Sequence, residues 1–113
     1  MIKVTIYKDK DNLITGFKVL GHAGYGQEGN DVVCAAVSAL VINTINSIEY
    51  FTSDTFDYSE DEKSGLIEFH LTSPISKNGN LLLSSLAYGL HGIKKECKGK
   101  YISISERVSQ KNK

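Results

Sequence analysis

The pattern of apolar and polar residues predicts two strands at the start of the chain. Apolar residues alternate with polar ones over residues 2–7, and a period of two is typical of a half-buried strand. A turn at residues 8–12 leads to a second predicted strand over about residues 13–20. The apolar residues of the first strand are Ile2, Val4 and Ile6, and the second strand is expected to have Thr15, Phe17 and Val19 on one side.

A long helix is predicted to follow, from Asp31 to about Phe51. Asp31 is expected to be its N-cap, because its carboxylate can accept the unpaired amides of the first turn. The first half of the helix, VVCAAVSALVI, is apolar nearly all round, which indicates burial on more than one side. A second sheet, the other helix or a dimer partner could supply the cover.

The second half of the chain predicts two more strands, a helix and a last strand. Phe56 and Tyr58 mark the third strand, and the charged turn Glu60–Gly65 leads to a fourth at residues 67–71. A helix is expected from about Gly79, and the last strand covers residues 101–107. The apolar residues that recur at helical spacing are Leu82, Leu83, Leu86, Leu90 and Ile93.

These elements predict a small α/β (α+β) domain of order ββαββαβ. Short hairpin connections favour a largely antiparallel sheet, packed with two helices in a sandwich, although the strand order stays open. With 113 residues the chain is long enough for one self-sufficient core. We expect residues 1–108 to form the domain and residues 109–113 a flexible tail.

The composition of the chain argues against several classes of function. Lysines and arginines balance aspartates and glutamates at 13 each, which argues against direct nucleic-acid binding. The chain shows no signal-peptide pattern and no run of about 18 apolar residues, so no membrane association is expected. Two cysteines without an export signal suggest reduced thiols in the cytoplasm. The spacing of cysteines and histidines fits no metal site, and no cofactor is expected.

Most of the chemical information lies in the segment GHAGYGQEGNDVVCAAVS, residues 21–38. Cys34 lies near the predicted helix start, where unpaired amides and the helix dipole favour a thiolate. His22 precedes it in a glycine-rich loop that could fold back to bring the imidazole to the sulfur. A nucleophile–base pair is one interpretation; the other is that Cys34 merely packs as a small apolar residue.

Other polar residues are ambiguous. Asp31 could orient His22 as a third catalytic residue or serve only as the helix cap. Ser38, one helical turn after Cys34, could touch the active site or bond back to the Cys34 carbonyl. The simplest interpretations are a solvated strand residue for His70 and, for His91, an interaction with the end of its helix. Cys97 is expected to be a structural or incidental thiol.

The segments Gly21–Gly24 and Gly29–Ser38 resemble the signature of the Prp family, the ribosomal-processing cysteine proteases of Firmicutes and related bacteria. The resemblance implies a homodimeric endopeptidase that removes the N-terminal extension of a large-subunit ribosomal protein. It places the catalytic histidine at His22 and the catalytic cysteine at Cys34. The loop expected to contact substrate comprises Gly21, Ala23, Gly24, Tyr25, Gly26 and Gly29. The alternatives are a thiol redox protein, which would lack an adjacent resolving cysteine, and a non-catalytic ribosome-associated binding module.

Overall fold

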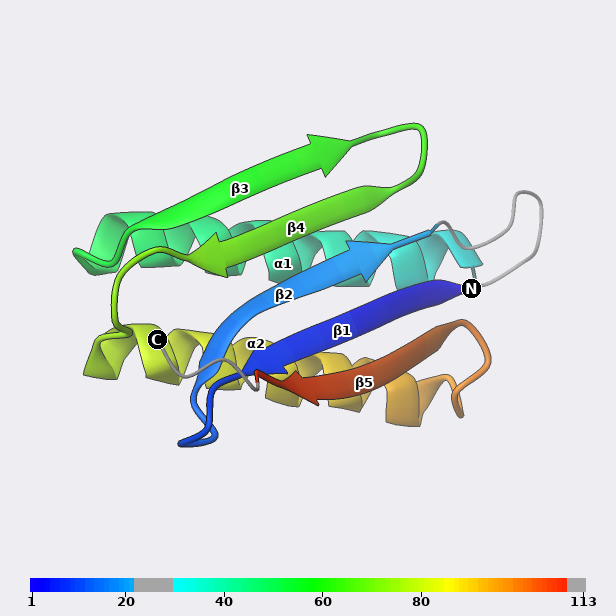
Figure 1. The fold of residues 1–113 in the computed structure, drawn as a ribbon. Helices are drawn as coiled ribbons and strands as arrows, with labels where there is room; N and C mark the ends of the chain where they lie inside the picture. Colours follow the sequence, from blue (N-terminus) through cyan, green and yellow to red (C-terminus); the bar gives the residue numbers. More distant parts are fainter. Residues whose placement is uncertain (22–29, 110–113) are drawn as a thin grey trace.

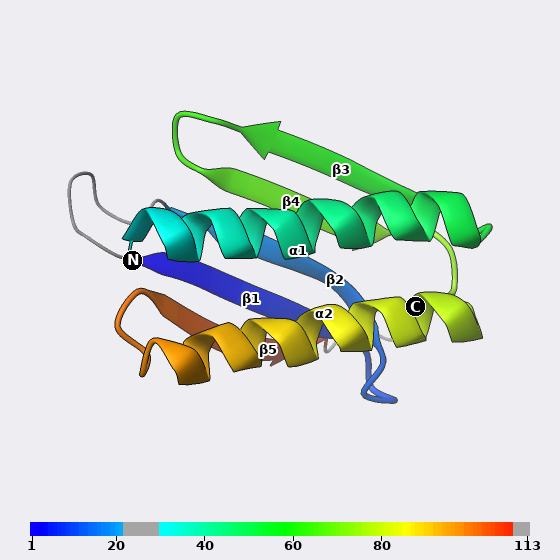
Figure 2. The same cartoon turned by 180° about the vertical axis from the view of Figure 1, so that it is seen from behind.

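A five-stranded sheet covered on one face by two helices forms the molecule (Figures 1 and 2). The computed structural model describes residues 1–21 and 30–109, with only the backbone described at residues 30 and 31. The strand order is β3-β4-β2-β1-β5. The strands are β1 (Ile2–Lys8), β2 (Ile14–Leu20), β3 (Phe56–Asp61), β4 (Leu66–Leu71) and β5 (Ile102–Val108). The predicted element order ββαββαβ is confirmed.

The sheet is largely antiparallel, as expected, with one parallel pair. β1–β2, β2–β4 and β3–β4 pair antiparallel, whereas β5 pairs with β1 in parallel, with Ile2 opposite Ile102. The parallel pair arises because the chain crosses back along a helix before β5, a connection that places a strand beside a distant partner. Such long-range pairing is not encoded in local periodicity.

A β-bulge in β2 corrects one prediction. Tyr7 pairs with Gly16 and Lys8 pairs with Ile14, so Thr15 is the extra residue between them. Strict alternation predicted Thr15 on one side with Phe17 and Ile14 on the other, but Ile14 is buried at 6% exposure and lies with Phe17. The inserted residue shifts the alternation by one position, so that an apolar side chain enters the core.

The helices are α1 (Asn30–Phe51) and α2 (Lys77–Glu96), and both begin before their predicted starts. Since α1 begins at Asn30, Asp31 lies within the first turn, and its assignment as the N-cap was wrong. In α2 the N-cap is Ser76, whose Oγ accepts from the Gly79 amide at 2.9 Å. Asp54 in turn accepts from the amide and hydroxyl of Ser76 at 3.2 and 2.8 Å, which ties the end of α1 to the start of α2.

The core lies between the sheet and the helices. Within the described residues, the sheet and α2 both cover the apolar surface of α1. Val37, Val41 and Ile48 are at most 3% exposed, against the sheet, while Leu40 lies at Gly89 of α2. By length and composition Val32–Phe51 could cross a membrane, contrary to the expectation from sequence. A single helix of this kind is weak evidence for a membrane span, because core helices of globular proteins can have the same length and composition.

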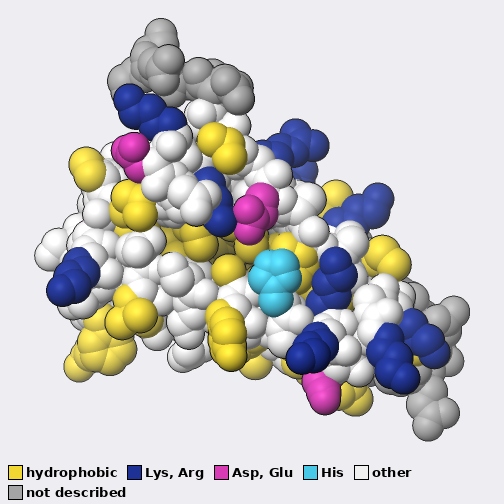
Figure 3. All heavy atoms as spheres, turned by 90° about the horizontal axis from the view of Figure 1, so that it is seen from below, with side chains coloured by type: hydrophobic (Ala, Val, Ile, Leu, Met, Phe, Trp, Pro, Cys, Tyr) yellow, Lys and Arg dark blue, Asp and Glu magenta, His cyan; other side chains and the backbone are white. Residues whose placement is uncertain are grey.

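The side of the molecule formed by β5 and α2 carries mixed charge. Figure 3 shows basic side chains with acidic ones between them, and hydrophobic side chains interspersed. Lys8 and Glu106 form an ion pair of 3.2 Å that joins β1 to β5. The distribution agrees with the zero net charge of the sequence.

Two glycines of α2 are expected to respond oppositely to alanine. A Cβ at Gly79 would collide with the Asp54 carboxylate, whereas a Cβ at Gly92 meets nothing within 4 Å. Gly79→Ala should therefore destabilise the fold by about 1–3 kcal/mol, and Gly92→Ala should stabilise it by about 0.5–1 kcal/mol. Urea unfolding of both variants measures the difference. Equal effects of the two substitutions would contradict the tight packing of the Ser76 cap.

Candidate active site

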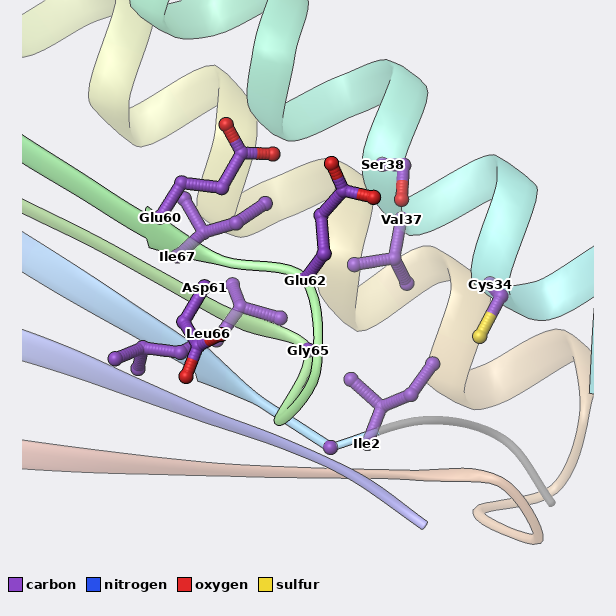
Figure 4. A pocket seen from close by; sticks show the side chains of 12 residues that line it. Ile2, Cys34, Val37, Ser38, Glu60, Asp61, Glu62, Gly65, Leu66 and Ile67 are labelled. Carbon is purple, nitrogen blue, oxygen red and sulfur yellow. The ribbon is translucent and has the colours of Figure 1, made fainter.

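An open pocket of about 220 Å³ lies between the N-terminal part of α1 and the β3–β4 hairpin (Figure 4). Three parts of the chain that are distant in sequence form its walls. The lining residues are Ile2, Val19, Gly21, Cys34, Val37, Ser38, Glu60, Asp61, Glu62, Gly65, Leu66 and Ile67.

Cys34 supplies the one nucleophilic sulfur among these lining residues. It is the fifth residue of α1, it is half-buried, and it borders the apolar core. Its position on the helix is set by Val33 and Val37, which are buried on the sheet side. A residue one position from a buried valine lies at the edge of the buried face. The Cys34 side chain therefore packs against the core on one side and borders the open pocket on the other.

The partner predicted for Cys34 lies outside the described residues. His22 belongs to this undescribed segment, and so do the predicted substrate-contacting residues Ala23, Gly24, Tyr25, Gly26 and Gly29. Gly21, the last described residue before the segment, lines the same pocket as Cys34. The chain that leads to His22 therefore starts at the pocket, while the Cys34–His22 pair stays a prediction.

Gly21 has a positive φ, and it lies close to the backbone of Met1 and Ser64. Its φ is +101°, its amide donates to the Ser64 carbonyl at 3.2 Å, and a Cβ would lie 2.7 Å from the Met1 carbonyl oxygen. Only glycine adopts this backbone without strain. The residue thereby joins the end of β2 to the N-terminus and to the β3–β4 turn.

We expect Gly21→Ala to lower the free energy of unfolding by about 1–3 kcal/mol. The substitution should also reduce peptide cleavage at temperatures where the variant stays folded, because it shifts the start of the segment that holds His22. Thermal unfolding and peptide cleavage, measured side by side, check both effects. Full stability together with full activity would show that the backbone at Gly21 tolerates a side chain.

The wall opposite Cys34 is acidic, and its residues belong to the segment that was predicted only as a charged turn. Asp61 holds the turn, since its carboxylate accepts from the Lys63 amide and the Ser64 hydroxyl, both at 3.1 Å. Glu60 accepts from the Tyr58 hydroxyl at 3.0 Å. Burial raises the pKa of Tyr58 above its usual range, and the hydrogen bond and the negative charge of Glu60 raise it further. In Figure 4, Glu62 extends from the turn toward α1.

Two further residues of α1, Ser38 and Asp31, were predicted as possible supporting residues of the site. Ser38 is exposed and lines the pocket together with Cys34. Thr44 and Thr52 of the same helix bond back to the carbonyls four residues earlier, at 2.7 Å each. Among the described residues no such bond is made by Ser38, which leaves its hydroxyl available to the pocket. The backbone of Asp31 lies in the first turn of α1, and its side chain is outside the description.

The remaining histidines and the second cysteine lie outside the lining of this pocket. His70 is exposed, lies 3.1 Å from Glu68 and has its ring centroid 5.2 Å from that of Tyr7. His91 is exposed on α2. Cys97 is the C-cap of α2, and its thiol lies 3.7 Å from the Lys94 carbonyl. Among the described residues neither cysteine forms a disulfide, and no group of residues there could hold a metal ion.

Comparison with known proteins identifies the class as that of a small cysteine protease. The chain belongs to the cysteine protease Prp family, whose model matches residues 1–103. The ribosomal processing cysteine protease Prp of Staphylococcus aureus (strain NCTC 8325 / PS 47) is 33% identical over 98 residues, which cover 85% of this chain and 91% of that protein. The protein of the same name from Bacillus subtilis (strain 168) is 29% identical over 102 residues, covering 87% and 91%.

Solved structures of relatives have the same fold. The essential ribosomal processing protease Prp from S. aureus, in complex with a covalently linked product peptide, matches with a TM-score of 0.85 and 27% identity. That match covers 95% of this chain and all of the other. The same protease in complex with a substrate peptide gives a TM-score of 0.87 and 26% identity at equal coverage. The predicted family and the predicted protease activity are therefore confirmed.

Proposed function

We propose that this protease removes the N-terminal extension of a large-subunit ribosomal protein, with Cys34 as the nucleophile and His22 as the base and acid. The observation that carries the proposal is the thiol of Cys34 in an open pocket of a Prp-family chain. Relatives bear the name ribosomal processing protease, and one of them holds a covalently linked product peptide. A covalent product agrees with nucleophilic catalysis by a cysteine.

The reaction follows from the chemistry of the two side chains. His22 takes the thiol proton, and the Cys34 thiolate attacks the carbonyl carbon of the scissile peptide bond. The tetrahedral intermediate collapses as the imidazolium gives its proton to the leaving amine, and an acyl-enzyme remains on the sulfur. Water, deprotonated by His22, then hydrolyses the thioester and frees the thiol. No metal or organic cofactor takes part.

The start of α1 suits the charges that develop in these steps. A helix N-terminus presents unpaired amides and the positive end of the helix dipole, which stabilise both a thiolate and an oxyanion. Because α1 begins at Asn30, the unpaired amides belong to residues before Cys34, and Cys34 lies one turn further along. Asp31 and Ser38 are proposed as supporting residues, through the orientation of His22 and through contact with the substrate respectively.

Incubation with the unprocessed ribosomal protein tests the proposed substrate. The expected product is the mature protein, shortened at its N-terminus by one cut, as mass spectrometry of the intact protein would show. A substrate that already lacks the extension is the matched control and should stay unchanged. An unprocessed protein of unaltered mass after prolonged incubation with active enzyme would contradict the assignment of the substrate.

We further propose a cytoplasmic homodimer that uses the outer sides of the helices. The side chains of Val32, Leu81 and Tyr88 are 72%, 67% and 85% exposed, and an apolar groove lies between α1 and α2. Apolar surface of this kind is a common feature of interfaces between copies of a chain. Light scattering coupled to size-exclusion chromatography should give twice the mass of one chain, and a Tyr88→Glu variant should shift the mass toward that of a monomer. A single-chain mass for the wild type would overturn the dimer.

A further inference from the structure

The turn between β3 and β4 is closed by its own side chains. The Asp61 carboxylate accepts from the Lys63 amide and the Ser64 hydroxyl, both at 3.1 Å. An aspartate that accepts from an amide two residues further on forms an Asx turn, which mimics a backbone turn. Gly65 completes the structure with a φ of +68° and an amide that donates to the Glu62 carbonyl at 3.3 Å. The shape of the turn therefore depends on the Asp61 side chain.

The same turn holds the end of β2. The Gly21 amide donates to the Ser64 carbonyl at 3.2 Å. This bond lies beyond Val19 and Ile67, the last residues that pair β2 with β4. Ser64 thus bonds to Asp61 through its hydroxyl and to Gly21 through its carbonyl. The two bonds form a continuous path from the Asp61 carboxylate to the backbone of Gly21.

Gly21 directly precedes His22, the base and acid of the proposed reaction. Peptide bonds are planar, so the backbone dihedrals of Gly21 set the direction in which the chain continues. A displacement of about 1 Å in an active site can lower the rate by about 10²-fold. Bonds that fix Gly21 therefore act on the geometry of the base.

Building on the proteolytic function proposed above, we propose that Asp61 is a positioning residue. Asp61 shapes the β3–β4 turn, the turn holds Gly21, and Gly21 directs the chain to His22. This role needs the hydrogen bonds of Asp61 and does not need its negative charge. Asp61 and Ser64 are exposed, and bonds at exposed positions contribute to local order more than to global stability. Loss of these bonds should therefore loosen the turn and leave the sheet folded.

Two substitutions at position 61 separate the hydrogen bonds from the charge. Asp61→Ala removes both bonds of the turn. Asp61→Asn removes the charge and keeps the bonds, because its amide oxygen accepts from the Lys63 amide and its amide nitrogen donates to the Ser64 hydroxyl oxygen. A carboxylate that acted on the imidazole through its charge would lose its effect in both variants.

Asp9→Ala is the matched control for the loss of an Asx turn. Asp9 lies between β1 and β2, where its carboxylate accepts from the Asp11 and Leu13 amides at 2.8 and 3.0 Å. The β1–β2 turn lies at the opposite end of the sheet from the β3–β4 turn (Figures 1 and 2). Asp9→Ala thus removes the same kind of turn without touching the path to Gly21.

Each variant is made alone and together with His22→Ala. Peptide cleavage gives kcat and KM, and thermal unfolding gives Tm. We expect Asp61→Ala to lower kcat by about 10–100-fold, because a displaced base transfers protons poorly, and to keep KM within about twofold of the wild type. Asp61→Asn and Asp9→Ala should keep the kcat of the wild type.

Alkylation of Cys34 shows whether Asp61 acts through His22. The rate of reaction with iodoacetamide is measured against pH, and digestion with mass spectrometry locates the adduct. In Asp61→Ala the pH profile should move toward that of His22→Ala, because a displaced imidazolium stabilises the thiolate less. The double variant Asp61→Ala/His22→Ala should react like His22→Ala alone, since residues that act through one path are not additive. A general loss of stability would lower Tm without moving this profile.

Four results would overturn the positioning role and leave the proteolytic function standing. These are the kcat of the wild type in Asp61→Ala, an equal loss in Asp61→Asn, an equal loss in Asp9→Ala, and slower alkylation in the double variant than in His22→Ala. Ser64→Ala removes one of the two bonds and keeps the carbonyl, so it supplies the same comparison if Asp61→Ala does not fold. Wild-type cleavage and alkylation in His22→Ala would overturn the proposed function and this inference with it.

Discussion

The Cys34→Ala variant is expected to fold like the wild type and to lose cleavage by at least about 10⁴-fold, since the acyl-enzyme cannot form without the sulfur. Alanine suits a helix, and Cys34 is only half-buried, so the free energy of unfolding should change by less than about 1 kcal/mol. Thermal unfolding and peptide cleavage, measured on the same preparation, separate the two effects.

The second thiol is the control for this experiment. Cys97 caps α2, outside the lining of the Cys34 pocket, so Cys97→Ser should keep kcat/KM within about twofold of the wild type, a difference of about 0.4 kcal/mol. Loss of activity in Cys97→Ser with full activity in Cys34→Ala would reverse the assignment of the nucleophile.

The His22→Ala variant should lower kcat by about 10²–10⁴-fold, the usual contribution of a positioned acid–base group. The thiolate population of Cys34 should fall as well, because an imidazolium beside the sulfur stabilises its anion. The rate of alkylation by iodoacetamide at neutral pH reports the thiolate, and peptide cleavage reports turnover. If both rates stay at their wild-type values, the Cys34–His22 pair does not exist.

Asp31→Asn is the matched comparison for His22→Ala. It removes one charge from the first turn of α1 and preserves the size of the side chain, at a cost of about 0.3–1 kcal/mol to the helix. We expect a smaller loss of activity than in His22→Ala. An equal loss would favour Asp31 as a third catalytic residue over a role in the helix alone.

Local patterns predicted those elements whose sequence follows one period throughout. The alternation in β1 and the helical spacing of Leu83, Leu86 and Leu90 correspond to residues that are at most 4% exposed. The bulge at Thr15 escaped prediction because one inserted residue leaves both flanking segments with the same period of two. The start of α2 was placed too late because the cap depends on Ser76 bonding to Asp54, across 22 residues of chain.

The site was predicted in part. The motif around Cys34 predicted a site at the start of α1. Three of the predicted residues, Gly21, Cys34 and Ser38, line one pocket there. The acidic wall of the pocket was missed, because Glu60 and Glu62 line one pocket with Cys34 only when the β3–β4 hairpin packs beside β2 and α1. Three successive acidic residues, Glu60 to Glu62, in a predicted turn were the available signal. The position of His22 relative to the thiol stays a prediction.

The most direct test of the central claim is the mass of the enzyme itself during turnover. The reaction with the unprocessed substrate is quenched in acid and the intact protease is analysed by mass spectrometry, followed by digestion to locate any adduct. The account predicts an added mass equal to the N-terminal product minus one water, bound to Cys34 and absent from Cys34→Ala. An adduct on another residue, or cleavage of the substrate by Cys34→Ala, would contradict it.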